Sequence, residues 1–220
     1  MIQLKNTGEI IPPSPFYLRR LCRMFERNHY VHLRRFLETD LLTEIQTRIK
    51  LSKFYTRVHK NVSVESCMKH NVTFQLLQFL LNDPLFFRWV QHIAGCGPIG
   101  NFLGRVYQMV PGQGHYDSWH DDVFIHIDGF QNRLVGLSIN LSFEVYEGGA
   151  LQLRRRNTPR ILREVSNVGF GDAILFRISP SFEHRLTPVT GKIPKIAYAG
   201  WFRSTPDFRD LFKRRANPSI

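Results

Sequence analysis

The chain has 220 residues, and its 43% hydrophobic content with 18 Phe is enough for the core of one globular domain and excludes a disordered protein. Lys and Arg outnumber Asp and Glu by 30 to 18, for a formal net charge of +12, and the three cysteines form no CxxC pair, which argues against a disulfide framework or a structural zinc site. Because the sequence has neither a signal-like apolar segment nor an apolar run of about 18 residues, we expect a soluble cytoplasmic protein without a membrane partner.

Basic residues gather in three places, 18–23, 153–160 and 212–216. Such clusters are typical of a surface for nucleic acid or an acidic partner, and equally of the solvated surface of a basic protein. No finger, basic-zipper or RNP-like motif accompanies them. Nucleic acid is therefore kept only as an alternative partner.

The first half of the chain is predicted to be mainly helical. Apolar residues recur at helical spacing in three stretches, 14–27, 34–51 and 73–95. Pro15 suits a first helical turn, and Thr39 or Asp40 is the expected N-cap of the second stretch. Residues 82–84, Asn-Asp-Pro, should divide the third stretch into two helices, which Gly95 should end.

After residue 98 the pattern changes to short β-rich runs separated by Gly, Pro and Asn turns. Seven such runs are present, at 104–110, 134–142, 150–155, 161–166, 173–178, 184–189 and 195–202. Closely spaced short strands of this kind predict a sandwich or barrel. Because no internal repeat is evident, we interpret the change as helices packing on a sheet and not as a domain boundary.

The stretch GHYDSWHDDVFIHID, residues 114–128, concentrates imidazoles and carboxylates in an otherwise basic chain. His120 and Asp122 are two positions apart, so they share one face if the segment is extended. His184, in the later stretch SFEHRLTPV, offers a third ligand. Two His and one carboxylate bound facially leave room for a cosubstrate and O₂, as in non-haem Fe(II) sites.

Other interpretations of this stretch remain open. Zinc also accepts two His and one Asp, and chance alone produces many HxD pairs in surface loops. Asp117 or Asp121 is suited to capping a turn. His115 and His126 are expected to be a loop residue and a strand residue instead of ligands.

The sequence around the HxD pair resembles the prolyl-4-hydroxylase-like branch of the 2-oxoglutarate- and Fe(II)-dependent dioxygenases. The family's elements occur in its order between residues 100 and 204: VPGQGHYDSWHDD, YEGGALQL, VGFGDAILF, SFEHRLTPVTGK and KIAYAGWF. They supply a Pro-Gly turn, the HxD pair, a Gly-Gly turn before a strand, a GD…F strand, the distal His and a basic residue six before a Trp. The ordered set is specific, although no single piece is.

The resemblance implies an α+β fold with a double-stranded β-helix core (jelly-roll, cupin-like) and N-terminal helices packed on its major sheet. We expect one dioxygenase domain over residues 1–220. Residues 1–98 would be mainly helical support, 99–204 the catalytic jelly roll, and 205–220 a basic C-terminal segment.

The resemblance also assigns roles to individual residues. It makes His120, Asp122 and His184 the iron ligands, with Fe(II), 2-oxoglutarate and O₂ as cofactors and ascorbate in support. Lys195, six before Trp201, falls where the family places the partner of the distal carboxylate of 2-oxoglutarate. The expected reaction is hydroxylation, desaturation or demethylation, since related halogenases carry a small residue in place of the carboxylate.

Two departures from the family pattern keep the cosubstrate residues open. Lys is less common than Arg at this position, and TGKIPK lengthens the interval after the distal His, so Lys192 and Arg203 are rivals of Lys195. The family often has a Tyr before the Pro-Gly turn, where this chain has Val110. Tyr107, three residues earlier, is either its replacement or a packed strand residue.

The segment FIHIDGFQNRLVG is the expected lid or substrate loop, in which Phe124, His126, Phe130 and Arg133 would face substrate or pack in the loop. The implied substrate is a peptide side chain, an amino acid or a natural product, and the basic surface favours an anionic, carrier-bound or polypeptide substrate. A nucleic-acid demethylase and a zinc- or metal-free binding module on the same fold are the alternatives.

Overall fold

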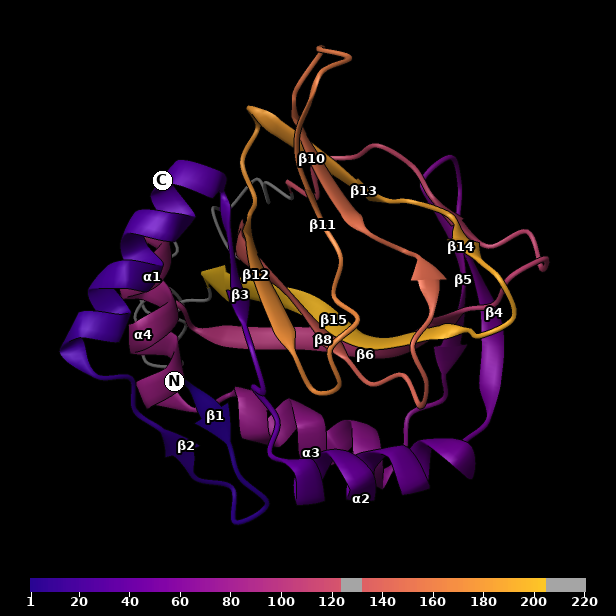
Figure 1. Ribbon diagram of the computed structural model, residues 1–220, viewed down its shortest axis with the longest axis horizontal. Helices are drawn as coiled ribbons and strands as arrows, with labels where there is room; N and C mark the ends of the chain where they lie inside the picture. The colour runs from indigo at the N-terminus through magenta and orange to yellow at the C-terminus, as the bar shows by residue number, and fades with distance from the viewer. Residues whose placement is uncertain (124–131, 205–220) are drawn as a thin grey trace, which may run out of the picture.

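The computed structural model describes residues 1–123 and 132–204 (Figure 1). Its helices are α1 (Pro15–Asn28), α2 (Thr39–Lys50), α3 (Val72–Leu81) and α4 (Pro84–Ala94). Its longer strands are β3 (Tyr30–Leu33), β4 (Phe54–His59), β5 (Ser63–Met68), β6 (Asn101–Met109), β8 (Asn132–Asn140), β10 (Leu151–Arg155), β11 (Ile161–Val165), β12 (Ala173–Arg177), β13 (Phe182–Leu186) and β15 (Lys195–Ser204). Its two-residue strands are β1 (Gln3–Leu4), β2 (Ile10–Ile11), β7 (Tyr116–Asp117), β9 (Glu147–Gly148) and β14 (Val189–Thr190).

Two antiparallel sheets face each other in the described part of the chain. The larger sheet has the strand order β3-β12-β8-β15-β6-β5-β4, with β7 paired to β5, and the smaller has the order β11-β10-β13. Inward-facing apolar side chains pack in part of the space between them, among them Leu151 and Val165 from the smaller sheet and Ile174 and Phe176 from β12. Figure 1 shows the smaller sheet above the long strands β6, β8 and β15.

The four helices cover the outer face of the larger sheet. Side chains alternate along a strand, so β6, β8 and β15 each present one apolar row to the helices. Phe102 and Val106 of β6 and Tyr198 and Phe202 of β15 pack there in one continuous core with Phe86 of α4. The helices thus fix the curvature of the sheet from outside and leave its inner face for the site.

Of the four sequence signals expected at helix ends, three are confirmed, those at Pro15, Asp83 and Gly95. Pro15 begins α1 after Ser14, whose hydroxyl accepts a hydrogen bond from the Tyr17 amide, as expected of a proline in the first turn. Asp83 caps α4 through the Phe86 amide, and Gly95 ends it with a left-handed φ of 61°. Among the helices of the described ranges, none has the length and apolarity needed to cross a membrane.

The expected N-cap of α2 is wrong. Thr39 and Asp40 both lie within the first helical turn, and Glu38 is the N-cap. The Glu38 carbonyl accepts the first helical hydrogen bond, from the Leu42 amide, while its side chain makes no capping bond. Asp40, the second residue of α2, still interacts favourably with the helix dipole. The sequence pattern alone does not distinguish an Asp in the first turn from an Asp at the N-cap.

Three strands from the first half join the larger sheet, and no sequence signal predicted them. β3 pairs with β12 at one edge, and β5 pairs with β6 through Ser66 and Cys67. β4 forms the other edge, with Arg57 opposite Glu65 of β5. The first half of the chain therefore supports the sheet from outside and also widens it.

One glycine on β8 allows the inner core to close. A Cβ on Gly136 would overlap the ring of Phe176, which lies directly across from it in the β8–β12 pair. The ring in turn lies 4.9 Å from the His184 ring, centroid to centroid. Gly136 therefore gives Phe176 the space from which it supports a histidine of the site described below.

Candidate metal centre

His120, Asp122 and His184 converge in the space between the two sheets. One ligand-capable atom of each lies within 4.8 Å of the others. His184 Nε2 is 3.2 Å from Asp122 Oδ2, and His120 Nε2 is 3.6 Å from the same oxygen. The three residues predicted to be metal ligands are thus brought together, and their donor atoms point at one another.

The two histidines are held together by their backbones. His120 and His184 form an isolated antiparallel bridge, in which each amide donates to the carbonyl of the other at 3.0 and 2.8 Å. His184 belongs to β13, where it faces Leu153 of β10, and it is 5% exposed. Secondary structure therefore sets the separation of the two imidazoles before any ligand binds.

Asp122 reaches the same point by a turn. The expectation of one extended face for His120 and Asp122 is wrong, because Asp122 has a left-handed φ of 55°. Asp tolerates this conformation better than most residues, and Asp121 supports it by accepting a hydrogen bond from the Val123 amide at 3.0 Å. Asp121 also pairs with Arg156 at 3.1 Å, away from the two histidines.

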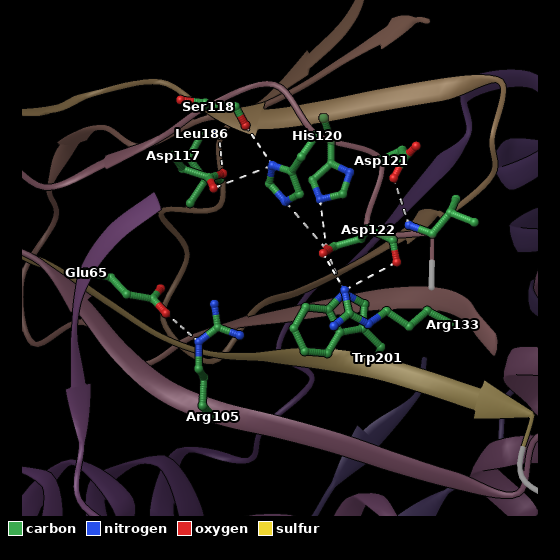
Figure 2. A network of polar contacts seen from close by, with 12 residues as sticks. Glu65, Arg105, Asp117, Ser118, His120, Asp121, Asp122, Arg133, Leu186 and Trp201 are labelled. Atoms are coloured by element: carbon green, nitrogen blue, oxygen red, sulfur yellow. Dashed lines mark hydrogen bonds and ion pairs between the residues drawn. The ribbon is translucent and has the colours of Figure 1, made fainter. Parts of the chain in front are cut away.

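Two further side chains fix the Asp122 carboxylate (Figure 2). Arg133 Nη1 donates to Oδ1 at 2.6 Å, and Trp201 Nε1 donates to Oδ2 at 2.7 Å. The Arg133 guanidinium stacks on the Trp201 ring, 3.7 Å from its centroid. Trp201 also packs against the inner core, and no sequence signal revealed its hydrogen bond to Asp122.

Hydrogen bonds also set the orientation of His120. Its Nδ1 lies 2.7 Å from the Ser118 carbonyl, which requires a proton on Nδ1 and leaves the Nε2 lone pair for a ligand. Asp117 Oδ1 lies 3.8 Å from the same nitrogen, while its Oδ2 accepts a hydrogen bond from the Leu186 amide. Asp117 thus binds the end of β13 and lies next to the Nδ1 side of the His120 imidazole.

The charges within the triad are those of a cation site. Burial alone lowers the pKa of His120, but hydrogen bonding to Asp122 and the charges of Asp117 and Asp122 raise it to about 9. Burial likewise opposes ionisation of Asp122, yet hydrogen bonds from His120 and His184 hold its pKa well below the usual range. The site retains a carboxylate and attracts positive charge, whether a proton or a metal ion.

A cavity of about 370 Å³ contains the triad and extends along the inner face of the larger sheet. Lys195 and Tyr107 line it, 3% and 4% exposed, from β15 and β6. Lys195 Nζ donates to the Gly149 carbonyl at 2.7 Å, and burial lowers its pKa to about 8. Burial raises the pKa of Tyr107 well above its ordinary value, so its phenol stays protonated.

The rivals of Lys195 lie differently. Lys192 is exposed in the turn before β15 and does not line the cavity. Arg203 lines the cavity near the opposite end of β15, where it faces Arg133 of β8. Among these three cations, Lys195 is the buried one on the cavity wall.

The remaining predicted positions divide into two groups. Arg133, expected in a loop, is the second residue of β8 and contacts Asp122. Phe124, His126 and Phe130 lie outside the described residues. His115 is a loop residue as expected, and its Nδ1 accepts a hydrogen bond from the Val110 amide at 2.9 Å.

The sequence patterns missed a charged group on the β4–β5–β6 side of the cavity. Arg105 Nε donates to Glu65 Oε1 at 2.5 Å, and Arg57 Nη1 lies 3.8 Å from the same oxygen. Cys67 also donates to this oxygen at 3.4 Å, and burial, followed by the charge of Glu65, raises the pKa of its thiol to about 11. Neither β4 (FYTRVH) nor β5 (SVESCM) alternates regularly between polar and apolar residues, so the sequence offered no signal for this group.

Residues 104–203 match the family model described as the 2OG-Fe(II) oxygenase superfamily. The matched stretch contains the triad, Tyr107 and Lys195. No curated protein matches the sequence.

Several solved structures are similar. A Pseudomonas putida prolyl-4-hydroxylase has a TM-score of 0.63 and 16% identity, over 86% of this chain and 100% of that one. A prolyl hydroxylase from Trichoplax adhaerens, in complex with a peptide fragment of hypoxia inducible factor, has a TM-score of 0.56 and 16% identity, over 94% and 98%. A non-heme alpha-ketoglutarate-dependent epimerase from nogalamycin biosynthesis has a TM-score of 0.64 and 14% identity, over 87% and 84%. The likenesses confirm the expected double-stranded β-helix fold with helices on its major sheet.

Proposed function

We propose that this protein, whose residues 104–203 match the 2OG-Fe(II) oxygenase superfamily, is an Fe(II)- and 2-oxoglutarate-dependent dioxygenase that hydroxylates a C–H bond of its substrate. The observation that carries the proposal is the convergence of His120, Asp122 and His184 in a cavity that also holds the buried Lys195. We treat residues 1–220 as one catalytic domain.

The donor set fits Fe(II). Two imidazole nitrogens and one carboxylate oxygen, all within 4.8 Å, are the ligand types of facial non-haem iron sites. The His120 Nε2 lone pair is available because Nδ1 faces the Ser118 carbonyl. Zinc takes the same donors, so the metal preference rests on the family match and on the size of the adjoining cavity, which a bound cosubstrate requires.

The chain's own side chains and backbone orient the ligands. Arg133 and Trp201 hold one Asp122 oxygen each, which fixes the plane of the carboxylate. The His120–His184 backbone bridge fixes the imidazoles. When bound, Fe(II) and 2-oxoglutarate supply the activation of O₂, with succinate and CO₂ as products.

Lys195 is proposed to bind the distal carboxylate of 2-oxoglutarate. Lys195 forms no ion pair with the carboxylates of residues 1–123 and 132–204, and a charged lysine in that state is costly at 3% exposure, since its contact with the Gly149 carbonyl does not neutralise it. A carboxylate would complete the ion pair. Tyr107, with its phenol protonated in the same cavity, is proposed to donate a hydrogen bond to the cosubstrate.

For the substrate we propose a peptide side chain, an amino acid or a small natural product. Support comes from the similar structures, which include prolyl hydroxylases, one of them with a peptide, and an epimerase from nogalamycin biosynthesis. The Asp122 carboxylate occupies the position that halide-transferring relatives leave small, which favours hydroxylation, desaturation or demethylation over halogenation, and of these we propose hydroxylation. The three free cysteines support a cytoplasmic location.

The test has two stages. Binding of 2-oxoglutarate is first measured with and without Mn(II), a redox-stable substitute for Fe(II). Candidate substrates are then incubated aerobically with Fe(II), 2-oxoglutarate and ascorbate, and succinate is quantified. We expect metal-dependent binding and substrate-stimulated succinate release. Absence of both would leave a binding module on the same fold as the better description.

A further inference from the structure

The cavity wall beyond the triad is lined by arginines from four strands of the larger sheet. They are Arg57 of β4, Arg105 of β6, Arg133 of β8 and Arg203 of β15. With Lys195, the described lining residues include five basic side chains against three carboxylates, Glu65, Asp117 and Asp122. Bound Fe(II) and 2-oxoglutarate would bring equal and opposite charges, so they leave this positive surplus unchanged.

The arginines are placed against the usual rule for β-sheets. Arg133 and Arg203 are direct partners across the β8–β15 pair, and like charges in that position destabilise a sheet. Such a local cost is expected where a site is arranged for a ligand of opposite charge.

Arg105 is oriented to receive that ligand. Its Nε is held by Glu65 at 2.5 Å, and its guanidinium lies 5.4 Å from the Trp201 ring centroid, on the ring that also stacks with Arg133. Its two Nη groups make no hydrogen bond to the described residues, and Figure 2 shows them directed into the space between Glu65 and Trp201. Two parallel N–H groups match a carboxylate or phosphate.

We infer that the substrate carries an anionic group, a carboxylate or a phosphate, which binds the Nη groups of Arg105 with Arg57 as a second cation. This inference rests on the proposed function, because it names the substrate class for the same cavity. Arg57 is suited to the role since its side chain is 36% exposed and reaches the cavity from the edge strand. An anion held there lies beside Trp201, the residue whose indole N–H donates to Asp122.

The test uses full-length protein loaded with Mn(II) and N-oxalylglycine, an inert analogue of 2-oxoglutarate, so that the cosubstrate site is filled. Calorimetry then compares two matched pairs of probes: benzoate with benzamide, and phenyl phosphate with phenol. We expect at least one anion to bind about tenfold more tightly than its neutral partner, and which anion does so separates carboxylate from phosphate. The preference should shrink as salt rises.

Variants test whether Arg57 and Arg105 cause the preference for the anionic probe. Arg57→Gln should weaken binding of the preferred anion about tenfold, the loss typical of one charge-assisted contact. The double variant Glu65→Gln with Arg105→Gln, which leaves no unpaired buried charge, should abolish the preference. Arg88→Gln, on the exposed face of α4, is the matched control and should bind like the wild type.

The possible failures are distinguishable. Loss of Mn(II)-dependent N-oxalylglycine binding by the wild-type protein would contradict the proposed function itself. Equal affinities for charged and neutral probes on the loaded protein would overturn only the inference. Weakened N-oxalylglycine binding in Arg57→Gln, with probe affinities unchanged, would overturn it too, because the arginines would then serve the cosubstrate.

Discussion

The indole N–H of Trp201 donates at 2.7 Å to Asp122 Oδ2, the same oxygen that both imidazoles of the triad face. Arg133 holds the other oxygen at 2.6 Å. The carboxylate therefore cannot rotate without losing a hydrogen bond on each side. Trp201 acts as a positioning residue, since it touches the ligand-capable group and not the metal site itself.

Trp201→Phe is expected to weaken Mn(II) affinity by about 10- to 100-fold, the usual loss when an outer hydrogen bond to a ligand is removed. Phe retains most of the ring that packs in the inner core, so the thermal midpoint should change little. Mn(II) binding is measured by electron paramagnetic resonance. Trp89→Phe, a half-buried tryptophan of α4, is the control. Unchanged affinity in Trp201→Phe would show that the hydrogen bond does not orient Asp122 for metal.

His120→Ala and His184→Ala should each abolish Fe(II)-dependent succinate release. Each removes one of three donors, and the remaining pair provides too few ligands for stable binding. Circular dichroism should remain native, since the bridge between the two residues is made by backbone groups. His92→Ala, exposed at the end of α4, should retain full turnover. Normal turnover in either triad variant would contradict the ligand assignment.

Lys195→Met should raise the Kd for 2-oxoglutarate by about 100-fold, because a buried ion pair to the distal carboxylate is lost. Lys192→Met, in the neighbouring exposed turn, should leave the Kd unchanged. Binding is measured by calorimetry at saturating Mn(II). The opposite pattern, with Lys192→Met impaired, would identify the turn lysine as the anchor.

Affinity for 2-oxoglutarate should fall as pH rises through about 8. Burial lowers the pKa of Lys195 to about 8 from the ordinary 10.5, so above that pH the free protein holds a neutral amine and must take up a proton to form the ion pair. The sign is therefore a rising Kd, by up to about tenfold per pH unit. Calorimetry between pH 7 and 9 at saturating Mn(II) measures it. A Kd independent of pH over this range would show that Lys195 does not bind the cosubstrate.

Gly136→Ala should destabilise the fold by about 1–3 kcal/mol, because its methyl group would overlap the Phe176 ring within a packed core. Urea unfolding measures the change. Gly97→Ala, where an added Cβ meets nothing within 4 Å, is the control and should be near neutral. Equal stabilities of the two variants would mean that the inner core can shift to admit a methyl group.

Sequence periodicity predicted the elements that bury apolar rows. The four helices and the strands of the second half were expected because their faces are apolar, as in β15, where Ile196, Tyr198 and Phe202 face the helices. β4 and β5 escaped prediction because their inward residues, Arg57 and Glu65, are charged and face the cavity. A strand that lines a polar site lacks the alternation by which strands are recognised.

The ligand-capable residues of the site could be predicted from the sequence, but the residues that hold them in place could not. The HxD spacing together with the family resemblance pointed to the three residues that the structure brings together, although for Asp122 a left-handed backbone replaces the expected extended face. The contacts of Trp201 and Arg133 with Asp122 depend on the pairing of β8 with β15, a relation between distant segments that one sequence does not encode locally. The cross-strand pairing of Arg133 with Arg203 likewise could not be predicted, because it too depends on the pairing of β8 with β15.

The Cys67 thiol has a consequence for the durability of such a catalyst. It lines the cavity that contains the triad, where a thiolate would compete as a soft metal ligand and would be the first group attacked by oxidants formed near a metal. Burial and the charge of Glu65 raise its pKa to about 11, so at neutral pH it remains a thiol. Burial, and after it the charge of Glu65, thereby keeps Cys67 in the thiol form, which binds metal and reacts with oxidants less readily than a thiolate.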